Sequence, residues 1–211
     1  MIDFQSIQHI VCFAAHCDDI EIGCVGSLMR IIEGRSDVHV DWVVLSGDET
    51  RRVETTRSAE YVLANVPSKN IITEPFTDTF FPEEYGSIKR FLHKQFADIQ
   101  PDLVFTHHRN DAHQDHRVVC ELSHSLFRGG LVLEYEIPKY DGDLGQPNTF
   151  ISISAEIMAK KQKIIADFFP TQKGRYWNQP ELFESIARIR GMESKSPTQF
   201  AEAFHCPKLV I

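Results

Sequence analysis

Short apolar runs rich in β-branched residues alternate with segments of helical periodicity through the first two thirds of the chain. The runs that predict buried strands are 9–15, 38–45, 70–75, 103–106 and 131–137. The segments that predict helices between them are 23–33, 49–65, 83–99 and 115–127. Neighbouring parallel strands need crossover connections, which are usually helices. The alternation therefore predicts an α/β fold, a Rossmann-like three-layer sandwich whose sheet is mostly parallel.

The length of 211 residues suits one domain with a sizeable core. The elements predicted in the C-terminal third are a loop at 141–148, a short strand at 150–153 and helices near 155–169 and 181–190. This third is small for an independent domain. We therefore expect residues 1–211 to form a single domain in which 140–211 is a C-terminal cap or lid.

Acidic residues outnumber basic ones, with 30 Asp and Glu against 22 Lys and Arg and a formal net charge of -8. A polyanion would be repelled by this charge, so nucleic acid is not an expected partner. We find no secretory signal and no apolar run near the roughly 18 residues of a membrane span. Five cysteines without a Cys-x-x-Cys pair favour a reducing compartment. We expect a soluble, cytoplasmic protein, and the sequence leaves a homo-oligomer open.

Histidines and carboxylates concentrate directly after two of the predicted strands. His16, Asp18 and Asp19 follow the first strand, and the segment 106–116 after the fourth strand holds four His and two Asp. Ligand sites of parallel α/β sheets lie beyond the C-terminal ends of the strands, so the two clusters are expected to converge. Imidazole nitrogen and carboxylate oxygen suit Zn²⁺, and three protein ligands with an open position for water form a hydrolytic centre.

Each cluster alone has an ordinary structural explanation. Adjacent Asp18 and Asp19 are typical of a helix N-cap and a solvated turn. His107 and His108 are typical of an exposed loop, and we expect them, with His124, to lie in loops or on a helix surface. The coincidence of two clusters at two strand ends favours a functional site over two unrelated polar loops.

Both clusters resemble the signatures of a known enzyme family. The run HCDD at 16–19, followed by a Glu and a glycine-containing helix start, resembles the His-Pro-Asp-Asp signature of the PIG-L/LmbE-like zinc-dependent de-N-acetylases. The run DAHQDH at 111–116 is similar to their Asp-x-His-x-Asp-His signature, and weaker likeness continues at 57–60, 171–172 and 200–204. The resemblance implies an LmbE-like fold and a hydrolase that removes acetyl from N-acetylglucosamine-type sugars or sugar conjugates.

The resemblance also implies a role for each residue of the two signatures. The zinc ligands that it implies are His16, Asp19 and His116, with another divalent metal as the alternative to Zn²⁺. It makes Asp18 the general base that takes a proton from the attacking water. It implies that His113 stabilises the oxyanion or protonates the departing amine, with Asp115 orienting its ring and raising its pKa.

Substrate contacts are expected outside the two signatures. Arg57 resembles the Arg of the family's second helix and is expected to reach a substrate oxygen or phosphate, with a surface ion pair to Glu60 or Glu54 as the alternative. Tyr140 follows the fifth strand and is expected to recognise a sugar, with a packed turn as the alternative. Cys17 replaces the family's Pro, and we expect a small residue that fits there rather than an extra ligand or a redox-sensitive thiol.

Three functions are compatible with these residues. The first is a zinc-dependent N-deacetylase acting on a small amino-sugar or glycoconjugate substrate. The second keeps the metal site but hydrolyses another N-acyl or amide conjugate. The third is a non-catalytic metal- or nucleotide-binding module, although the first βα turn has only Gly23 and Gly26 and lacks the G-x-G-x-x-G pattern.

Overall fold

Strands β1 to β7 form one sheet in the order β3-β2-β1-β4-β5-β7-β6 in the computed structural model, which describes residues 4–209. The strands are β1 (His9–Ala14), β2 (His39–Ser46), β3 (Ser68–Phe76), β4 (Leu103–His107), β5 (Leu131–Tyr135), β6 (Thr149–Ile153) and β7 (Phe200–His205). Strands β1 to β5 run parallel, and β7 pairs antiparallel with both β5 and β6. The sheet is mostly parallel, as the sequence predicts.

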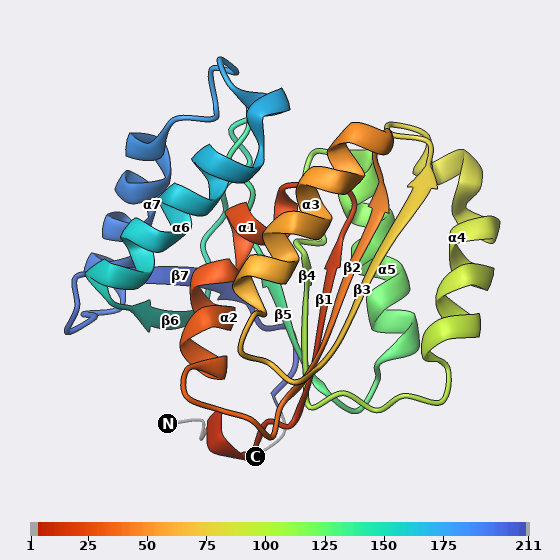
Figure 1. Cartoon of the computed structure of the whole chain (residues 1–211), viewed down its shortest axis with the longest axis horizontal. Helices are drawn as coiled ribbons and strands as arrows, with labels where there is room; N and C mark the ends of the chain where they lie inside the picture. Colours follow the sequence, from red (N-terminus) through yellow and green to blue (C-terminus); the bar gives the residue numbers. More distant parts are fainter. Residues whose placement is uncertain (1–3, 210–211) are drawn as a thin grey trace.

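Helices cover both faces of this sheet (Figure 1). The α-helices are α1 (Asp19–Gly23), α2 (Val25–Ile32), α3 (Glu49–Val62), α4 (Phe81–Phe96), α5 (Gln114–Leu126), α6 (Ala155–Phe168) and α7 (Pro180–Glu193). One apolar core lies between the sheet and α1, α2, α3, α6 and α7, and a second lies under α4 and α5. The predicted three-layer α/β sandwich is confirmed. Across residues 4–209 no helix has the length and apolar character needed to cross a membrane.

The structure differs from the predicted elements at two places. The helix predicted at 23–33 is α2, which begins at Val25 because Cys24 adopts φ -146° and ψ 3°, outside the helical region. A separate short helix, α1, precedes it at Asp19–Gly23 and is absent from the predicted elements. The strand β7 is absent from the predicted elements, since Ala and Glu are poor strand formers. It forms because Phe200 and Phe204 are buried and both of its edges are paired.

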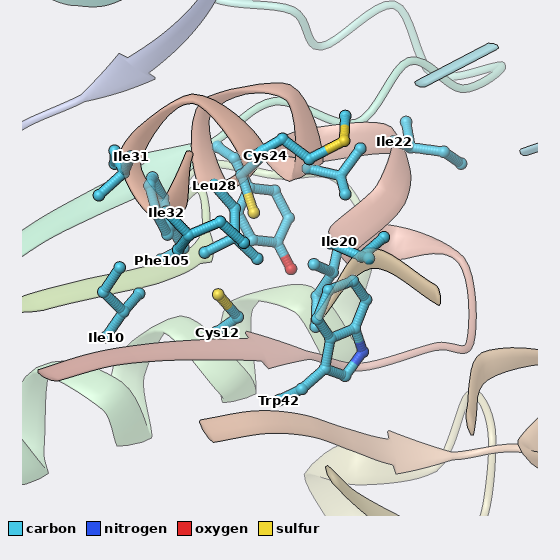
Figure 2. Close-up of a cluster of buried hydrophobic side chains, with 14 of the residues drawn as sticks. Ile10, Cys12, Ile20, Ile22, Cys24, Leu28, Ile31, Ile32, Trp42 and Phe105 are labelled. Carbon is cyan, nitrogen blue, oxygen red and sulfur yellow. The ribbon is translucent and has the colours of Figure 1, made fainter. Parts of the chain in front are cut away.

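Packing of α1 and α2 on the sheet fixes the chain just after β1. Ile20 of α1 and Leu28 of α2 are fully buried above Cys12 of β1 and Trp42 of β2 (Figure 2). Complete burial of a side chain of Ile or Leu size stabilises the fold by about 1.5–3 kcal/mol. The segment between β1 and α1, which carries the first polar cluster, is therefore anchored at both ends.

The C-terminal third is tied to the start of α2 through a buried carboxylate. Glu202 of β7 accepts hydrogen bonds from the backbone N of Gly26 at 3.0 Å and of Ser27 at 2.6 Å. Lys161 of α6 donates to Glu202 at 2.6 Å and to the carbonyl of Ile22 at 2.7 Å. The carboxylate thus satisfies N–H groups that the first turn of a helix leaves free.

Replacing Glu202 with Ala is expected to lower the free energy of unfolding by about 3–5 kcal/mol, because the buried ammonium of Lys161 would lose its partner. Urea unfolding followed by circular dichroism measures this loss. Glu184→Ala is the matched control, since Glu184 pairs with Arg188 in solvent and its loss is expected to cost about 0.3–0.5 kcal/mol. Equal losses in the two variants would contradict the assignment.

Candidate active site

The two polar clusters lie together because β1 and β4 are neighbouring parallel strands. Ile10 of β1 pairs with Leu103 of β4, so both strands end at the same edge of the sheet. The segment that follows β1 carries His16, and the segment that follows β4 leads to His116 in the first turn of α5. The expected convergence of the two clusters is therefore present.

Three buried donor atoms, from the residues expected to be metal ligands, face one point. His16 Nδ1 lies 3.1 Å from His116 Nε2 and 3.4 Å from Asp19 Oδ2, and the last two atoms are 3.7 Å apart. Ligands of a tetrahedral Zn²⁺ bonded at about 2.0–2.2 Å lie about 3.3–3.6 Å from one another. The three atoms therefore fit one face of such a tetrahedron and leave its fourth corner open.

Asp111, in the loop before α5, holds His116 from behind. Its Oδ2 lies 3.0 Å from His116 Nδ1 and 2.8 Å from Lys139 Nζ, and its Oδ1 accepts a hydrogen bond from the backbone N of His113 at 2.8 Å. Although burial opposes it, contact with His116 keeps the pKa of Asp111 well below its usual value. A carboxylate in this position orients a ligating imidazole and leaves its other nitrogen for the metal.

Asp18 is buried beside the three donor atoms and is held on one side only. Its Oδ1 accepts a hydrogen bond from Arg51 Nη2 at 3.3 Å, whereas its Oδ2 is buried without a partner among residues 4–209. Burial, followed by the negative charge of Asp19, raises the pKa of Asp18 to about 6. An unpaired carboxylate oxygen with a raised pKa has the properties of a general base that works near neutral pH.

The neighbouring Asp19 is placed in the opposite electrostatic environment. Although burial opposes it, the imidazoles of His116 and His107 hold the pKa of Asp19 well below its usual range. Burial, then the neighbouring His107, lowers the pKa of His116 to about 3. An ionised carboxylate and a neutral imidazole are the forms in which these side chains bind a metal.

His113 and Asp115 do not form the expected pair. His113 is the N-cap of α5, and its Nδ1 accepts a hydrogen bond from the backbone N of Asp115 at 3.2 Å. The carboxylate of Asp115 instead accepts hydrogen bonds from the backbone N of Thr79 at 2.7 Å and of Phe81 at 3.1 Å. Side chains two positions apart in a helical turn point in different directions. Burial, then the charge of His16, lowers the pKa of His113 below its usual value, although the negative charge of Asp115 acts in the expected upward direction.

His107 belongs to the site, and its expected position in an exposed loop is wrong. It is the last residue of β4 and fully buried, with Nε2 3.2 Å from Asp19 Oδ2 and its ring stacked on His116 at 3.8 Å between centroids. Its Nε2 accepts a hydrogen bond from the backbone N of Ala15 at 3.0 Å. The signal in the sequence is the two-residue period of the strand, which puts His107 on the same face as Phe105.

His108 lies in the loop after β4 and His124 lies part-exposed on α5, as expected, although His108 is buried. His108 Nδ1 lies 2.9 Å from Glu134 Oε2, and His124 Nε2 lies 2.7 Å from Glu134 Oε1. Arg109 pairs with the same buried carboxylate at 2.6 Å. These contacts form a separate polar cluster around Glu134 of β5, with side chains from the loop after β4 and from α5.

Neither residue expected to contact substrate lies at this site. Arg57 is exposed on α3, and Arg51 of the same helix reaches Asp18 instead. Arg57 is six residues after Arg51, which places it about 9 Å further along the helix axis and about 240° around it. Arg57 therefore cannot reach the position that Arg51 occupies beside Asp18. Tyr140 is 73% exposed and outside the cleft that borders Asp18. Asp78, which no sequence motif indicates, lies 3.0 Å from His16 Nε2.

A cleft of about 360 Å³ opens beside the donor atoms. Its lining from the first two thirds of the chain includes Asp18, Arg51 and His113, and the C-terminal third contributes Arg175 and Trp177. Polar and charged groups therefore surround its inner end, and an aromatic ring lies in its wall. A ligand of monosaccharide size fits such a volume.

Cys17 packs away from the donor atoms. Its side chain is fully buried, and its Sγ donates a hydrogen bond to the carbonyl of Ser46 at 3.2 Å. Burial raises the pKa of this thiol to about 11, which opposes both metal ligation and oxidation. The structure thus favours the interpretation of Cys17 as a small residue that fits between the loop and β2.

Substituting Gly23 with Ala is expected to lower the free energy of unfolding by about 1–3 kcal/mol, because a Cβ atom would lie 2.6 Å from Cγ of Tyr135. The hydroxyl of Tyr135 lies 3.2 Å from His107 Nε2, so the displacement would reach the site. Gly86→Ala is the control. Gly86 is an exposed residue of α4, and an added Cβ atom would contact only the tip of Arg90, so this substitution is expected to raise the free energy of unfolding by about 0.5–1 kcal/mol. Thermal and urea unfolding compare the two, and a stabilised Gly23→Ala variant would contradict the packing argument.

Comparison with known proteins identifies a family and a shared fold. A family model described as PIG-L, GlcNAc-PI de-N-acetylase, matches residues 11–127. N,N'-diacetylchitobiose deacetylase from Pyrococcus horikoshii has a TM-score of 0.73 and 22% sequence identity, over 96% of this chain and 84% of that chain. A deacetylase of the A40926 pseudoaglycone has a TM-score of 0.69 and 14% identity, over 93% of this chain and 96% of that chain.

The same fold also occurs with another reaction. A 4-carboxy-2-hydroxymuconate hydratase from Pseudomonas putida has a TM-score of 0.71 and 15% identity, over 97% of this chain and 98% of that chain. Identities this low establish a shared fold and leave the chemistry to the residues of each site. Because the family model covers more than half of the residues, including both His/Asp clusters, the chain belongs to the PIG-L family of de-N-acetylases.

Proposed function

We propose that this chain is a Zn²⁺-dependent N-deacetylase that hydrolyses the acetamide of an N-acetylglucosamine-type sugar or sugar conjugate. The observation that carries the proposal is the convergence of His16 Nδ1, Asp19 Oδ2 and His116 Nε2 beside the unpartnered oxygen of Asp18. Family membership supports the same reaction. In the proposed site these three residues hold the metal and Asp111 orients His116.

A bound Zn²⁺ would supply a Lewis acid and lower the pKa of water to about 7. Asp18 accepts a proton from the water whose oxygen attacks the acetamide carbonyl carbon, and its free Oδ2 is the acceptor. The C–N bond then breaks, the sugar nitrogen takes a proton, and acetate leaves. The raised pKa of Asp18 supports this role, because a base of that strength can both take and return a proton near neutral pH.

His113 contributes a hydrogen-bond donor to the same reaction. Its Nδ1 accepts from the backbone N of Asp115, which leaves the proton of a neutral ring on Nε2. His113 lines the cleft, so we propose that this N–H stabilises the developing oxyanion or the departing nitrogen. Asp115 takes a positioning role in the proposal: it fixes the segment at 79–81 through two backbone N–H groups.

Arg51, rather than Arg57, is the arginine of the proposed site. Its Nη2 holds Asp18 at 3.3 Å, and its Nε is buried without a partner in the described part of the chain. Trp177, in the wall of the cleft, offers a flat face for the C–H groups of a sugar ring. Tyr140 is too far into solvent to share that role in the proposed site.

Asp18→Asn is expected to reduce kcat by about 10²–10⁴-fold while the metal content stays unchanged, because an amide cannot accept the proton. The assay measures free amine and acetate released from N-acetylglucosamine, N-acetylated chito-oligosaccharides and N-acetylglucosamine conjugates, with metal counted by mass spectrometry. N-propionyl and longer N-acyl analogues distinguish a deacetylase from a broader amidase. Amine release from none of these compounds by fully metal-loaded protein would contradict the proposed reaction, and an Asp18→Asn variant of full activity would contradict the mechanism.

Arg51→Ala is expected to lower kcat/KM by about 10–100-fold, because a charged hydrogen bond beside Asp18 is lost. Arg57→Ala on the exposed side of the same helix is the matched control, and its kcat/KM is expected to stay within about twofold. Steady-state kinetics on the best substrate of the panel separates the two. A larger loss of kcat/KM in Arg57→Ala than in Arg51→Ala would contradict the role proposed for Arg51 and would support the substrate contact at Arg57 that the family resemblance implies.

A further inference from the structure

A second group of side chains that could hold a metal ion lies where strands β1 and β2 begin, at the opposite end of the strands from the candidate active site. His9 begins β1 and His39 begins β2, and the two residues are paired in the parallel register. Asp41 follows two positions after His39, so the two side chains lie on the same face of the sheet. His9 is seven residues before His16, which places the group about 20 Å along the strands from the candidate active site.

The three side chains direct their polar atoms at one another. His9 Nε2 lies 2.6 Å from Asp41 Oδ2, and His39 Nε2 lies 3.3 Å from Asp41 Oδ1. The two imidazole rings are nearly perpendicular, with centroids 4.7 Å apart. One ligand atom from each residue lies within 4.8 Å of the other two. Two imidazole nitrogens thus share one carboxylate.

Neighbouring strands supply supporting contacts. His39 Nδ1 lies 2.7 Å from Ser68 Oγ, which fixes the ring and keeps its Nε2 directed at Asp41. Asn70 Nδ2 donates to Asp41 Oδ1 at 2.8 Å and lies 3.3 Å from His39 Nε2. Side-chain partners behind a ligand are the arrangement that orients imidazoles and carboxylates in metal sites.

Burial and charge favour a cation at this position. The side chain of Asp41 is 1% exposed, whereas those of His9 and His39 are 24% and 28% exposed, so an ion has a path from solvent to a buried carboxylate. Within residues 4–209 no lysine or arginine forms an ion pair with Asp41. A buried carboxylate held only by imidazoles and an amide keeps a negative charge that a dication would neutralise.

The cluster around Glu134 provides the contrast. Cys120, His124 and Glu134 also place three ligand atoms within 4.8 Å of one another. Arg109 already pairs with that carboxylate at 2.6 Å and lies 3.1 Å from His124 Nε2. The fixed guanidinium charge repels a metal ion there, whereas no lysine or arginine of the described part of the chain pairs with Asp41.

We propose that His9, His39 and Asp41 bind a divalent transition-metal ion of the Zn²⁺, Co²⁺ or Ni²⁺ class at a second site, separate from the candidate active site. Two imidazoles and one carboxylate suit these ions. The N···O separation expected around a tetrahedral ion, about 3.3 Å, equals that of His39 and Asp41. His9 lies 2.6 Å from the other oxygen of the same carboxylate, so its ring would move outward to make room for the ion, which its partial exposure permits. The ion would link β1 to β2 at the start of the sheet and stabilise it.

The test counts Zn²⁺ bound to the full chain after equilibrium dialysis. The double variant His9→Ala/His39→Ala is expected to bind one equivalent less than the wild type and to keep the wild-type deacetylase activity. His93→Ala, which removes an exposed imidazole from α4, is the control and is expected to lose nothing. Identical zinc content in the wild type and the double variant would overturn the second site.

A second set of variants, which lacks the candidate active site, tests the second metal site independently of the proposed function. In His16→Ala/His116→Ala the candidate active site is dismantled, and one equivalent of Zn²⁺ is expected to persist and to disappear when Asp41→Asn is added. Zn²⁺ at 100 times its dissociation constant is expected to raise the Tm of the His16→Ala/His116→Ala variant by roughly 5–10 °C, and to leave that of the triple variant unchanged. Zinc bound to neither variant would overturn the second site, whatever the wild-type enzyme does with substrate.

Discussion

Backbone hydrogen bonds between β1 and β4 hold together two polar segments that lie far apart in the sequence. His16 and His116 are 100 residues apart, yet their ring nitrogens approach to 3.1 Å because the two strands run parallel and end at the same edge. Tyr135 of β5 strengthens this edge from the next strand, since its hydroxyl donates to the carbonyl of Phe13 at 2.6 Å. The positions of the candidate ligand atoms therefore depend on the register of the two strands.

Asp19 is the electrostatic centre of this edge. Its Oδ2 accepts a hydrogen bond from the backbone N of His16 at 2.7 Å and lies 3.2 Å from His107 Nε2. Asp18 adds a second buried carboxylate, which pairs with Arg51 at 3.3 Å. The site therefore carries an excess of buried negative charge, which is costly unless a cation compensates it. A resident dication would offset that cost, so metal binding and stability of this edge are expected to be linked.

Features that depend on neighbouring residues or on a periodic pattern could be predicted from the sequence. Apolar periodicity locates β1 to β6, and the contiguous runs at 16–19 and 111–116 locate the two clusters, because each run follows a predicted strand. Contacts that depend on how distant helices and strands are placed could not be predicted from the sequence. Asp78 reaches His16 only through the turn before α4, and Arg51 reaches Asp18 only through the angle of α3. His107 was missed for a smaller reason: β4 runs one residue beyond the strand predicted at 103–106, and that residue is the imidazole.

Chemistry and selectivity are encoded in different parts of this chain. The residues proposed to hold the metal and move protons lie within 11–127, the part that the family model matches. The walls of the cleft formed by 137–139 and by Gln172, Arg175 and Trp177 lie outside it. A hydratase and two deacetylases share this fold at identities of 14–22%, so the scaffold tolerates different substrates and even different reactions. Variation in the second region is therefore expected to change which substrate enters the cleft, while the register of β1 and β4 continues to place the donor atoms. Lys139, which pairs with Asp111 at 2.8 Å, is one contact through which the two regions remain connected.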